Sequence, residues 1–107
     1  MHAASGGSTL HLTAEEQHAV QSILQSIIPD RTVWVFGSRI TDKHKPYSDL
    51  DLVVMGEEAL PLATTADLRE AFSDSDLKFK VDLLVWSELT DNFKQIIRNH
   101  HVVIQTD

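Results

Sequence analysis

The sequence contains no cysteine, so a disulfide framework and a zinc site built on thiolates are both excluded. Its hydrophobic segments are only a few residues long, far too short to span a bilayer. The first residues also lack the basic start and the apolar centre of a signal peptide. These absences together predict a protein of the cytoplasm with no membrane association.

Positive charge is also scarce in this chain. Nine Lys and Arg residues stand against 16 Asp and Glu residues, which gives a formal net charge of −7. Binding of DNA or RNA depends on cationic side chains that neutralise phosphates, so direct nucleic-acid binding is not expected. Four cations lie close together in the sequence, and they are more simply interpreted as part of a solvated loop: Arg31, Arg39, Lys43 and Lys45.

What is present fits one globular domain. The chain has 107 residues, of which 42% are hydrophobic and 23% are charged. A domain of this size buries somewhat over ~60% of its unfolded surface around a single core. Residues 1–11 carry glycine and serine without any periodicity, and we expect them to be a flexible leader. The folded domain is expected to span residues 12–107.

Capping and periodicity predict the helices. Thr13 and Glu16 form a capping-box pattern, and Pro29 ends the segment that follows. Between them, apolar residues recur at helical spacing: Val20, Ile23, Leu24, Ile27 and Ile28. Two shorter helices are expected, one after residues 64–65 and one capped by Asp91.

Runs of β-branched and aromatic residues predict four strands. These runs are Val33–Phe36, Asp49–Met55, Phe79–Trp86 and Val102–Ile104. Strands and helices alternate along the chain, which predicts an α/β fold with a small sheet flanked by helices.

Two aspartates at the head of the second strand are the most informative polar residues. Asp49 and Asp51 are two positions apart, so in a strand they point to the same face, about 6–7 Å from each other. Like charges at this spacing repel unless a cation lies between them. Two Mg²⁺ ions, with phosphate oxygens as further ligands, would satisfy the pair. Asp82 interrupts another apolar strand and joins the site if the two strands are neighbours; the alternative is that all three carboxylates face solvent.

The segment Gly37-Ser38-Arg39 follows the first strand and has the features of an anion site. A strand that turns into a helical start presents backbone N–H groups to an anion. Glycine lets a phosphate approach the backbone closely, and arginine adds a fixed positive charge. Gly-Ser after a strand is by itself more often a simple turn, and its importance here comes from the acidic pair that follows.

Ten residues separate Ser38 from Asp49, so the segment reads G-S-x10-D-x-D. With this pattern the chain resembles the nucleotidyltransferase superfamily that includes DNA polymerase β, over about residues 30–105. The resemblance implies the minimal polymerase β-like fold, with a small mixed sheet, and the binding of ATP together with two Mg²⁺ ions.

The resemblance also implies a role for each motif residue. Gly37 and Ser38 would bind the β and γ phosphates, and Arg39 would stabilise the leaving pyrophosphate. Asp82 would also take the proton from the acceptor hydroxyl. The implied metal ligands are Asp49, Asp51 and Asp82.

More closely, Gly37-Ser38-Arg39 and Pro46-Tyr47-Ser48 resemble the minimal nucleotidyltransferases (MNT proteins) that are antitoxins of HEPN-domain toxins. This resemblance implies transfer of AMP from ATP to a hydroxyl, with tyrosine the expected side chain, of a cognate HEPN RNase toxin held in a hetero-oligomer. Two rival hypotheses stay open: an antitoxin that acts by binding and occlusion only, and an antibiotic nucleotidyltransferase. Lys80 also has two open interpretations, an ion pair with Asp82 or a contact with a phosphate.

Overall fold

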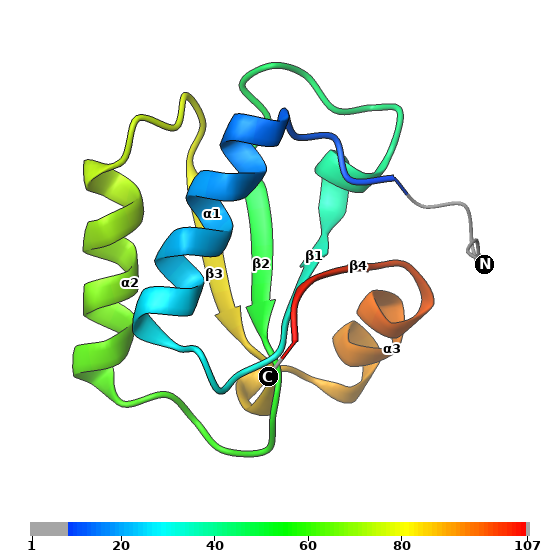
Figure 1. The fold of residues 1–107 in the computed structure, drawn as a ribbon. Helices are drawn as coiled ribbons and strands as arrows, with labels where there is room; N and C mark the ends of the chain where they lie inside the picture. The colour runs from blue at the N-terminus through cyan, green and yellow to red at the C-terminus, as the bar shows by residue number, and fades with distance from the viewer. Residues whose placement is uncertain (1–8, 107) are drawn as a thin grey trace.

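A mixed sheet organises the molecule in the computed structural model, which describes residues 9–106 (Figure 1). Within these residues its strands are β1 (Val33–Phe36), β2 (Leu50–Val54), β3 (Val81–Val85) and β4 (Val102–Gln105). The strand order is β3-β2-β1-β4. β2 and β3 run parallel, whereas β1 is antiparallel to both of its neighbours. The predicted α/β fold with a small mixed sheet is confirmed.

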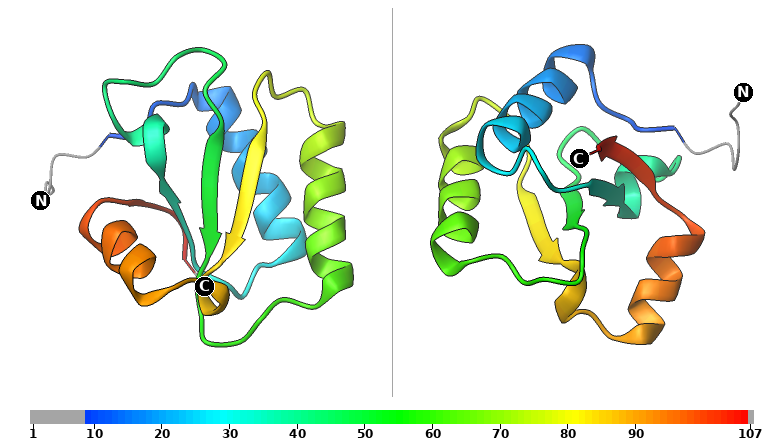
Figure 2. Two further views of the ribbon diagram at one scale, coloured as in Figure 1. Left: turned by 180° about the vertical axis from the view of Figure 1, so that it is seen from behind. Right: turned by 60° about the horizontal axis from the view of Figure 1, so that its bottom comes forward.

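Helices cover both faces of this sheet. They are α1 (Ala14–Ile27), α2 (Leu62–Asp74) and α3 (Asp91–Asn99). α1 and α2 lie against one face and α3 lies against the other, as the two further views show (Figure 2). Two short 3-10 turns follow the strands β1 and β3, at Gly37–Ile40 and Trp86–Glu88.

The first helix forms as its sequence predicts. The Thr13 hydroxyl accepts the Glu16 N–H at 3.0 Å, and the Glu16 carboxylate accepts the Thr13 N–H at 2.9 Å. This capping box satisfies two of the amides that a helix start leaves without a partner. Val20 and Leu24 are fully buried on the inner side of α1, and Pro29 follows its end.

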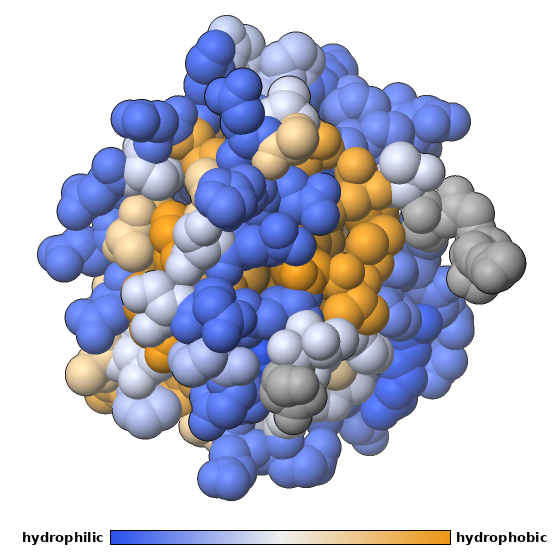
Figure 3. All heavy atoms as spheres, in the orientation of Figure 1, coloured by the Kyte–Doolittle hydropathy of each residue, from blue (hydrophilic) through white to orange (hydrophobic). Residues whose placement is uncertain are grey.

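The larger part of the core lies between the sheet and the helices α1 and α2. Alternate strand residues point into it, as the two-residue period of a strand requires. These residues are Val33, Val35, Leu50, Leu52, Val54 and Leu83. Seen from the side of α1 and α2, the molecular surface is mostly hydrophilic, with apolar side chains gathered in a strip near β1 and β4 (Figure 3).

A smaller core lies on the opposite face. Here α3 buries Ile97 against Val53 and Trp86, at the end of the sheet where β2 and β3 finish. The half of this face where β2 and β3 begin is left more open. The candidate site lies on that open half.

Several element boundaries differ from the predicted ones. β2 begins at Leu50, so Asp49 precedes the strand instead of opening it. β3 begins at Val81, two residues later than predicted. α2 begins at Leu62, so residues 64–65 lie inside it. The cap of α3 is Thr90, whose hydroxyl accepts the Phe93 N–H at 3.2 Å, and not Asp91.

The expected leader is only partly described. Residues 1–8 lie outside the described residues, so the prediction for them stays a prediction. The residues that follow belong to the fold: Leu10 and Leu12 pack against the larger core, and the His11 N–H donates to the Arg39 carbonyl at 2.7 Å. No helix within residues 9–106 combines the length and apolar character needed to cross a membrane.

Candidate active site

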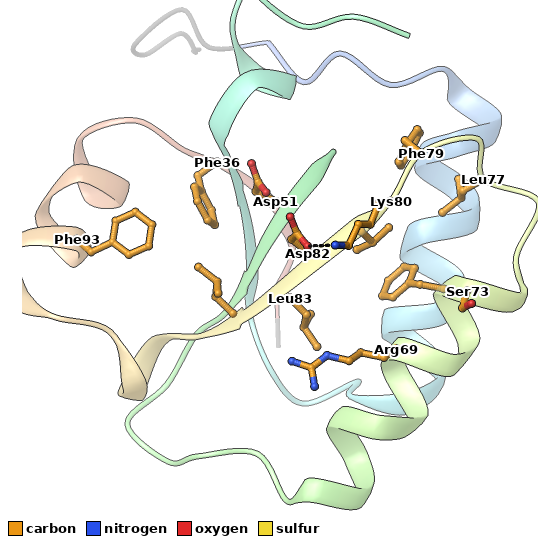
Figure 4. A pocket seen from close by; sticks show the side chains of 13 residues that line it. Phe36, Asp51, Arg69, Ser73, Leu77, Phe79, Lys80, Asp82, Leu83 and Phe93 are labelled. Carbon is orange, nitrogen blue, oxygen red and sulfur yellow. Dashed lines mark ion pairs between the residues drawn. The ribbon is translucent and has the colours of Figure 1, made fainter. Parts of the chain in front are cut away.

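Two of the three predicted carboxylates face each other on adjacent strands. Asp51 of β2 pairs in register with Asp82 of β3, and with Phe36 of β1 on its other side. Register partners in a sheet point to the same face. Asp51, Asp82 and Phe36 therefore form one row across the open half of the sheet (Figure 4).

The electrostatics of this row centre on Asp51. Burial raises the pKa of the Asp51 carboxyl from 3.8 to about 6, with further contributions from the negative charges of Asp82 and Asp49. Desolvation and like charges both disfavour the ionised form of a carboxyl group. A cation bound at this place would relieve both effects. The raised pKa thus fits the predicted use of these residues as metal ligands.

The arrangement is not a preformed metal cage. Within residues 9–106, no three histidine or acidic side chains lie close enough together to hold an ion alone. Asp49 precedes β2 and is exposed, whereas Asp51 and Asp82 face each other. Mg²⁺ keeps several water and phosphate ligands in nucleotide sites, so two or three carboxylates without a cage suit it better than a structural metal. The donor set fits Mg²⁺ carried in with a triphosphate.

Asp82 has a second charged neighbour. The Lys80 ammonium lies 3.6 Å from the Asp82 carboxylate, with the two side chains 75% and 42% exposed (Figure 4). Of the two open interpretations of Lys80, the ion pair is present here. A pair with this exposure is worth little to stability, so it can be broken at small cost when a ligand enters.

The turn after β1 brings Gly37 directly against Asp51. Gly37 has a φ of +83°, a region that favours glycine. A Cβ at this position would collide with Oδ2 of Asp51. From the sequence alone, Gly37 is explained by the close approach of a phosphate, and the structure adds a second reason, which is room for the Asp51 carboxylate.

Arg39 is held by contacts with the protein itself. Its side chain is buried, with 4% exposed, and its guanidinium lies 4.2 Å above the centre of the Phe79 ring. Three of its N–H groups donate to backbone carbonyls, those of Ser48 (3.1 Å), His11 (3.1 Å) and Pro46 (2.9 Å). In this structure the donors of Arg39 are therefore used by the protein's own backbone, and the stabilisation of the leaving pyrophosphate by Arg39 stays a prediction. A guanidinium with several donors in one plane can instead join chain segments that are far apart in sequence.

A cavity of about 700 Å³ lies along β3 and includes the carboxylate row. This volume is within the range of small-molecule sites. On one side of β3 it is lined by Asp51, Asp82 and Lys80, and on the other side by residues of α2 such as Arg69 and Ser73 (Figure 4).

Three apolar side chains that border the carboxylates were not predicted as part of the site. They are Phe36, Leu84 and Phe93. The sequence presents Phe36 and Leu84 only as strand residues and Phe93 only as a helix residue. The one signal for Phe36 is its place directly before Gly37, at the end of β1.

Comparisons with known proteins identify the family of this chain. A model of the family described as polymerase beta, nucleotidyltransferase matches residues 19–107. The probable protein adenylyltransferase MntA of Haemophilus influenzae (strain ATCC 51907 / DSM 11121 / KW20 / Rd) is 50% identical over 96 residues, which cover 90% of this chain and 84% of that protein.

Solved structures share the fold at low sequence identity. A toxin-antitoxin crystal structure with AMP-PNP is 20% identical, with a TM-score of 0.68, and covers 85% of this chain and 73% of that one. A tri-AMPylated Shewanella oneidensis HEPN toxin in complex with its MNT antitoxin is 21% identical, with a TM-score of 0.60 and the same two coverages. The match over residues 19–107 and the 50% identity with the probable protein adenylyltransferase MntA show that this chain belongs to the polymerase β nucleotidyltransferase family.

Proposed function

We propose that this protein is an antitoxin that transfers AMP from ATP to a hydroxyl side chain, with tyrosine expected, of a cognate HEPN-domain RNase toxin. The observation that carries the proposal is the 50% identity with the probable protein adenylyltransferase MntA over 90% of this chain. The carboxylate row Asp51–Asp82 supports it, since metal ions held by acidic side chains can stabilise the charge of phosphates during their transfer. The use of ATP supports the cytoplasm as its compartment.

Each motif residue has a separate role in the proposed reaction. The acceptor oxygen forms a bond to the α-phosphorus of ATP, while the bond from that phosphorus to the bridging oxygen of the pyrophosphate breaks. Asp82 takes the proton of the acceptor hydroxyl, because its side chain is 42% exposed and only a weak ion pair holds it. Gly37 and Ser38 begin the turn on which the β and γ phosphates would lie.

Metal dependence is part of the same proposal. Two Mg²⁺ ions would be held by Asp49 and Asp51, with Asp82 completing the second site. When bound, Mg²⁺ supplies charge neutralisation at the phosphates. The raised pKa of Asp51 supports this assignment, since its carboxylate gains most from a neighbouring cation.

Arg39 acts indirectly in this proposal. It joins the loop of residues 41–49 to residue His11 through its three carbonyl contacts. Because that loop ends in Asp49, we assign Arg39 as a positioning residue that sets where the first carboxylate lies.

The proposal is tested by intact-mass spectrometry of the cognate toxin after incubation with this protein, ATP and Mg²⁺. We expect one or more increments of AMP on the toxin, and no increment with the Asp82→Asn variant. The toxin should remain without RNase activity after this protein is removed, because the block is covalent.

The rival hypothesis of occlusion predicts a different result. It has some support, because related structures are themselves complexes of toxin and antitoxin. If the mass of the toxin stays unchanged and its RNase activity returns on separation, occlusion accounts for neutralisation and the transfer proposal is wrong.

A further inference from the structure

The carboxylate row is bordered by an apolar surface formed by Phe36, Leu84 and Phe93. We call this surface the aromatic wall, after its two phenylalanine rings. The rings of Phe36 and Phe93 pack edge to face, with centroids 5.8 Å apart and an interplanar angle of 87°. Leu84 lies two residues beyond Asp82 on β3, so both point to the same face. All three side chains line the cavity that contains Asp51 and Asp82, and Figure 4 labels Phe36 and Phe93.

The wall is the uncovered margin of the smaller core. Farther along the same face, Val53 and Ile97 have 0% exposed and Trp86 only 4%. The wall residues, by contrast, are half-buried. Apolar surface left in contact with water next to charged groups is unfavourable, and covering it with a ligand ring recovers the hydrophobic free energy. The ligand must join a flat apolar part to a polar group that reaches the carboxylates.

We propose that the aromatic wall receives the ring of the acceptor tyrosine while its hydroxyl lies at Asp82. This inference rests on the proposed transfer of AMP to a tyrosine and adds the residues that select the acceptor. Side chains at i and i+2 of a strand are about 6–7 Å apart. A phenol whose oxygen lies at Asp82 therefore extends its ring along β3 over Leu84, toward the Phe93 ring.

The adenine of ATP is the other flat ring in the reaction, and it fits this place less well. A ribose separates the base from the α-phosphate, so the base lies farther from the reacting atoms than the ring of the acceptor does. The wall begins at Phe36, in register with Asp51, and at Leu84, next to the residue that takes the proton. A subsite that starts this close to the reacting atoms suits the acceptor.

The test uses Phe93→Leu, which removes the ring but keeps an apolar side chain in the smaller core. Phe36→Leu is the second variant, so that a folding defect in one does not end the test. Ile96→Ala is the matched control, because Ile96 lies on the same helix, is 63% exposed and does not line the cavity. Thermal unfolding establishes that each variant is folded.

Initial rates of AMP transfer are measured against toxin concentration at saturating ATP, and ATP binding is measured separately by calorimetry. Loss of a ring contact should raise the KM for the toxin roughly three- to tenfold in both Leu variants. The Kd for ATP should not change, and Ile96→Ala should behave as the wild type does.

Three results would overturn the inference or what it rests on. A higher Kd for ATP with an unchanged KM for the toxin would assign the wall to the adenine instead. No change in either constant means that the wall binds neither ring. Absence of AMP transfer by the wild-type protein overturns the proposed function itself, and this outcome is seen before any variant is compared.

Discussion

At the scale of single residues, the pKa of Asp51 has a measurable consequence. Its folded-state value, about 6, is above the unfolded value of 3.8. Protonated Asp51 therefore favours the folded state below pH 3.8, and that stability is lost as the pH rises through 6. Asp51→Asn should increase the free energy of unfolding at pH 7.5 by of order 1 kcal/mol, with little difference near pH 4. Urea unfolding without nucleotide or divalent ions measures this.

The same variant should lose AMP transfer, because an amide cannot replace the charge of the carboxylate. Asp67→Asn is the control, since Asp67 is exposed on α2 and its loss should change neither property. A variant of Asp51 that is less stable than the wild type at pH 7.5 would contradict the electrostatic interpretation.

Gly37 offers a second test at this scale. Gly37→Ala should cost about 1–2 kcal/mol of stability because of the positive φ. It should also lower the rate of AMP transfer by roughly 10²-fold, because the new Cβ displaces the Asp51 carboxylate from its place beside Asp82. Transfer assays and urea unfolding give the two values.

Gly56→Ala is the matched control for this change. Gly56 also has a positive φ, of +121°, but a Cβ there meets the flexible end of Arg31 and no site residue. We expect Gly56→Ala to lose stability while its transfer rate stays normal. Equal loss of activity in the two variants would show that backbone strain alone accounts for the effect.

Site residues could be predicted from the sequence where the signal lies in residues close together in the chain. The spacing from Gly37 and Ser38 to the acidic pair indicated the site, because two like charges at the head of an apolar strand need a partner. The backbone contacts of Arg39 could not be predicted in this way. Its carbonyl partners include His11, 28 residues away in sequence, and only the folded chain brings them together.

At the scale of elements, the loop of residues 41–49 depends on Arg39. Arg39→Lys keeps the charge but cannot reproduce three planar donors. We expect a loss of stability of about 1–3 kcal/mol, because partly buried carbonyls lose their partners. We also expect weaker Mg²⁺-dependent ATP binding by calorimetry, since the loop no longer fixes Asp49.

Arg31→Lys is the control for this loop. Arg31 also donates to two backbone carbonyls, those of Met55 and Glu58, both at 2.8 Å, at a distance from the loop. Its replacement should reduce stability without changing ATP affinity. Normal ATP binding by Arg39→Lys would remove the positioning role of Arg39.

Most elements could be predicted, because capping residues and apolar periodicity act within a few residues. The capping box of α1 is the strongest case. The starts of β2 and β3 could not be predicted to the residue. They depend on where the two strands pair: the first register pair joins Leu50 to Val81, so Asp49 and Lys80 fall outside the strands.

At the scale of the whole molecule, the two cores differ in size. The core under α1 and α2 is the larger, and α3 covers only a few buried residues. Local opening takes least free energy where few apolar contacts are lost. We therefore expect the amides of α3 to exchange with deuterium faster than those of β1 and β2. Equal protection of α3 and the central strands would contradict this.

The order of strands in the mixed sheet also determines how the site can lose its geometry during unfolding. β3 is an edge strand that pairs only with β2 within residues 9–106, and it carries Asp82. Detachment of this one strand separates Asp82 from Asp51 and leaves the pairing of β1 with β2 and β4 in place. Close to the unfolding transition, we expect partly folded molecules that have lost this pairing and are inactive. Loss of enzyme activity then begins at a lower temperature or denaturant concentration than the loss of secondary structure.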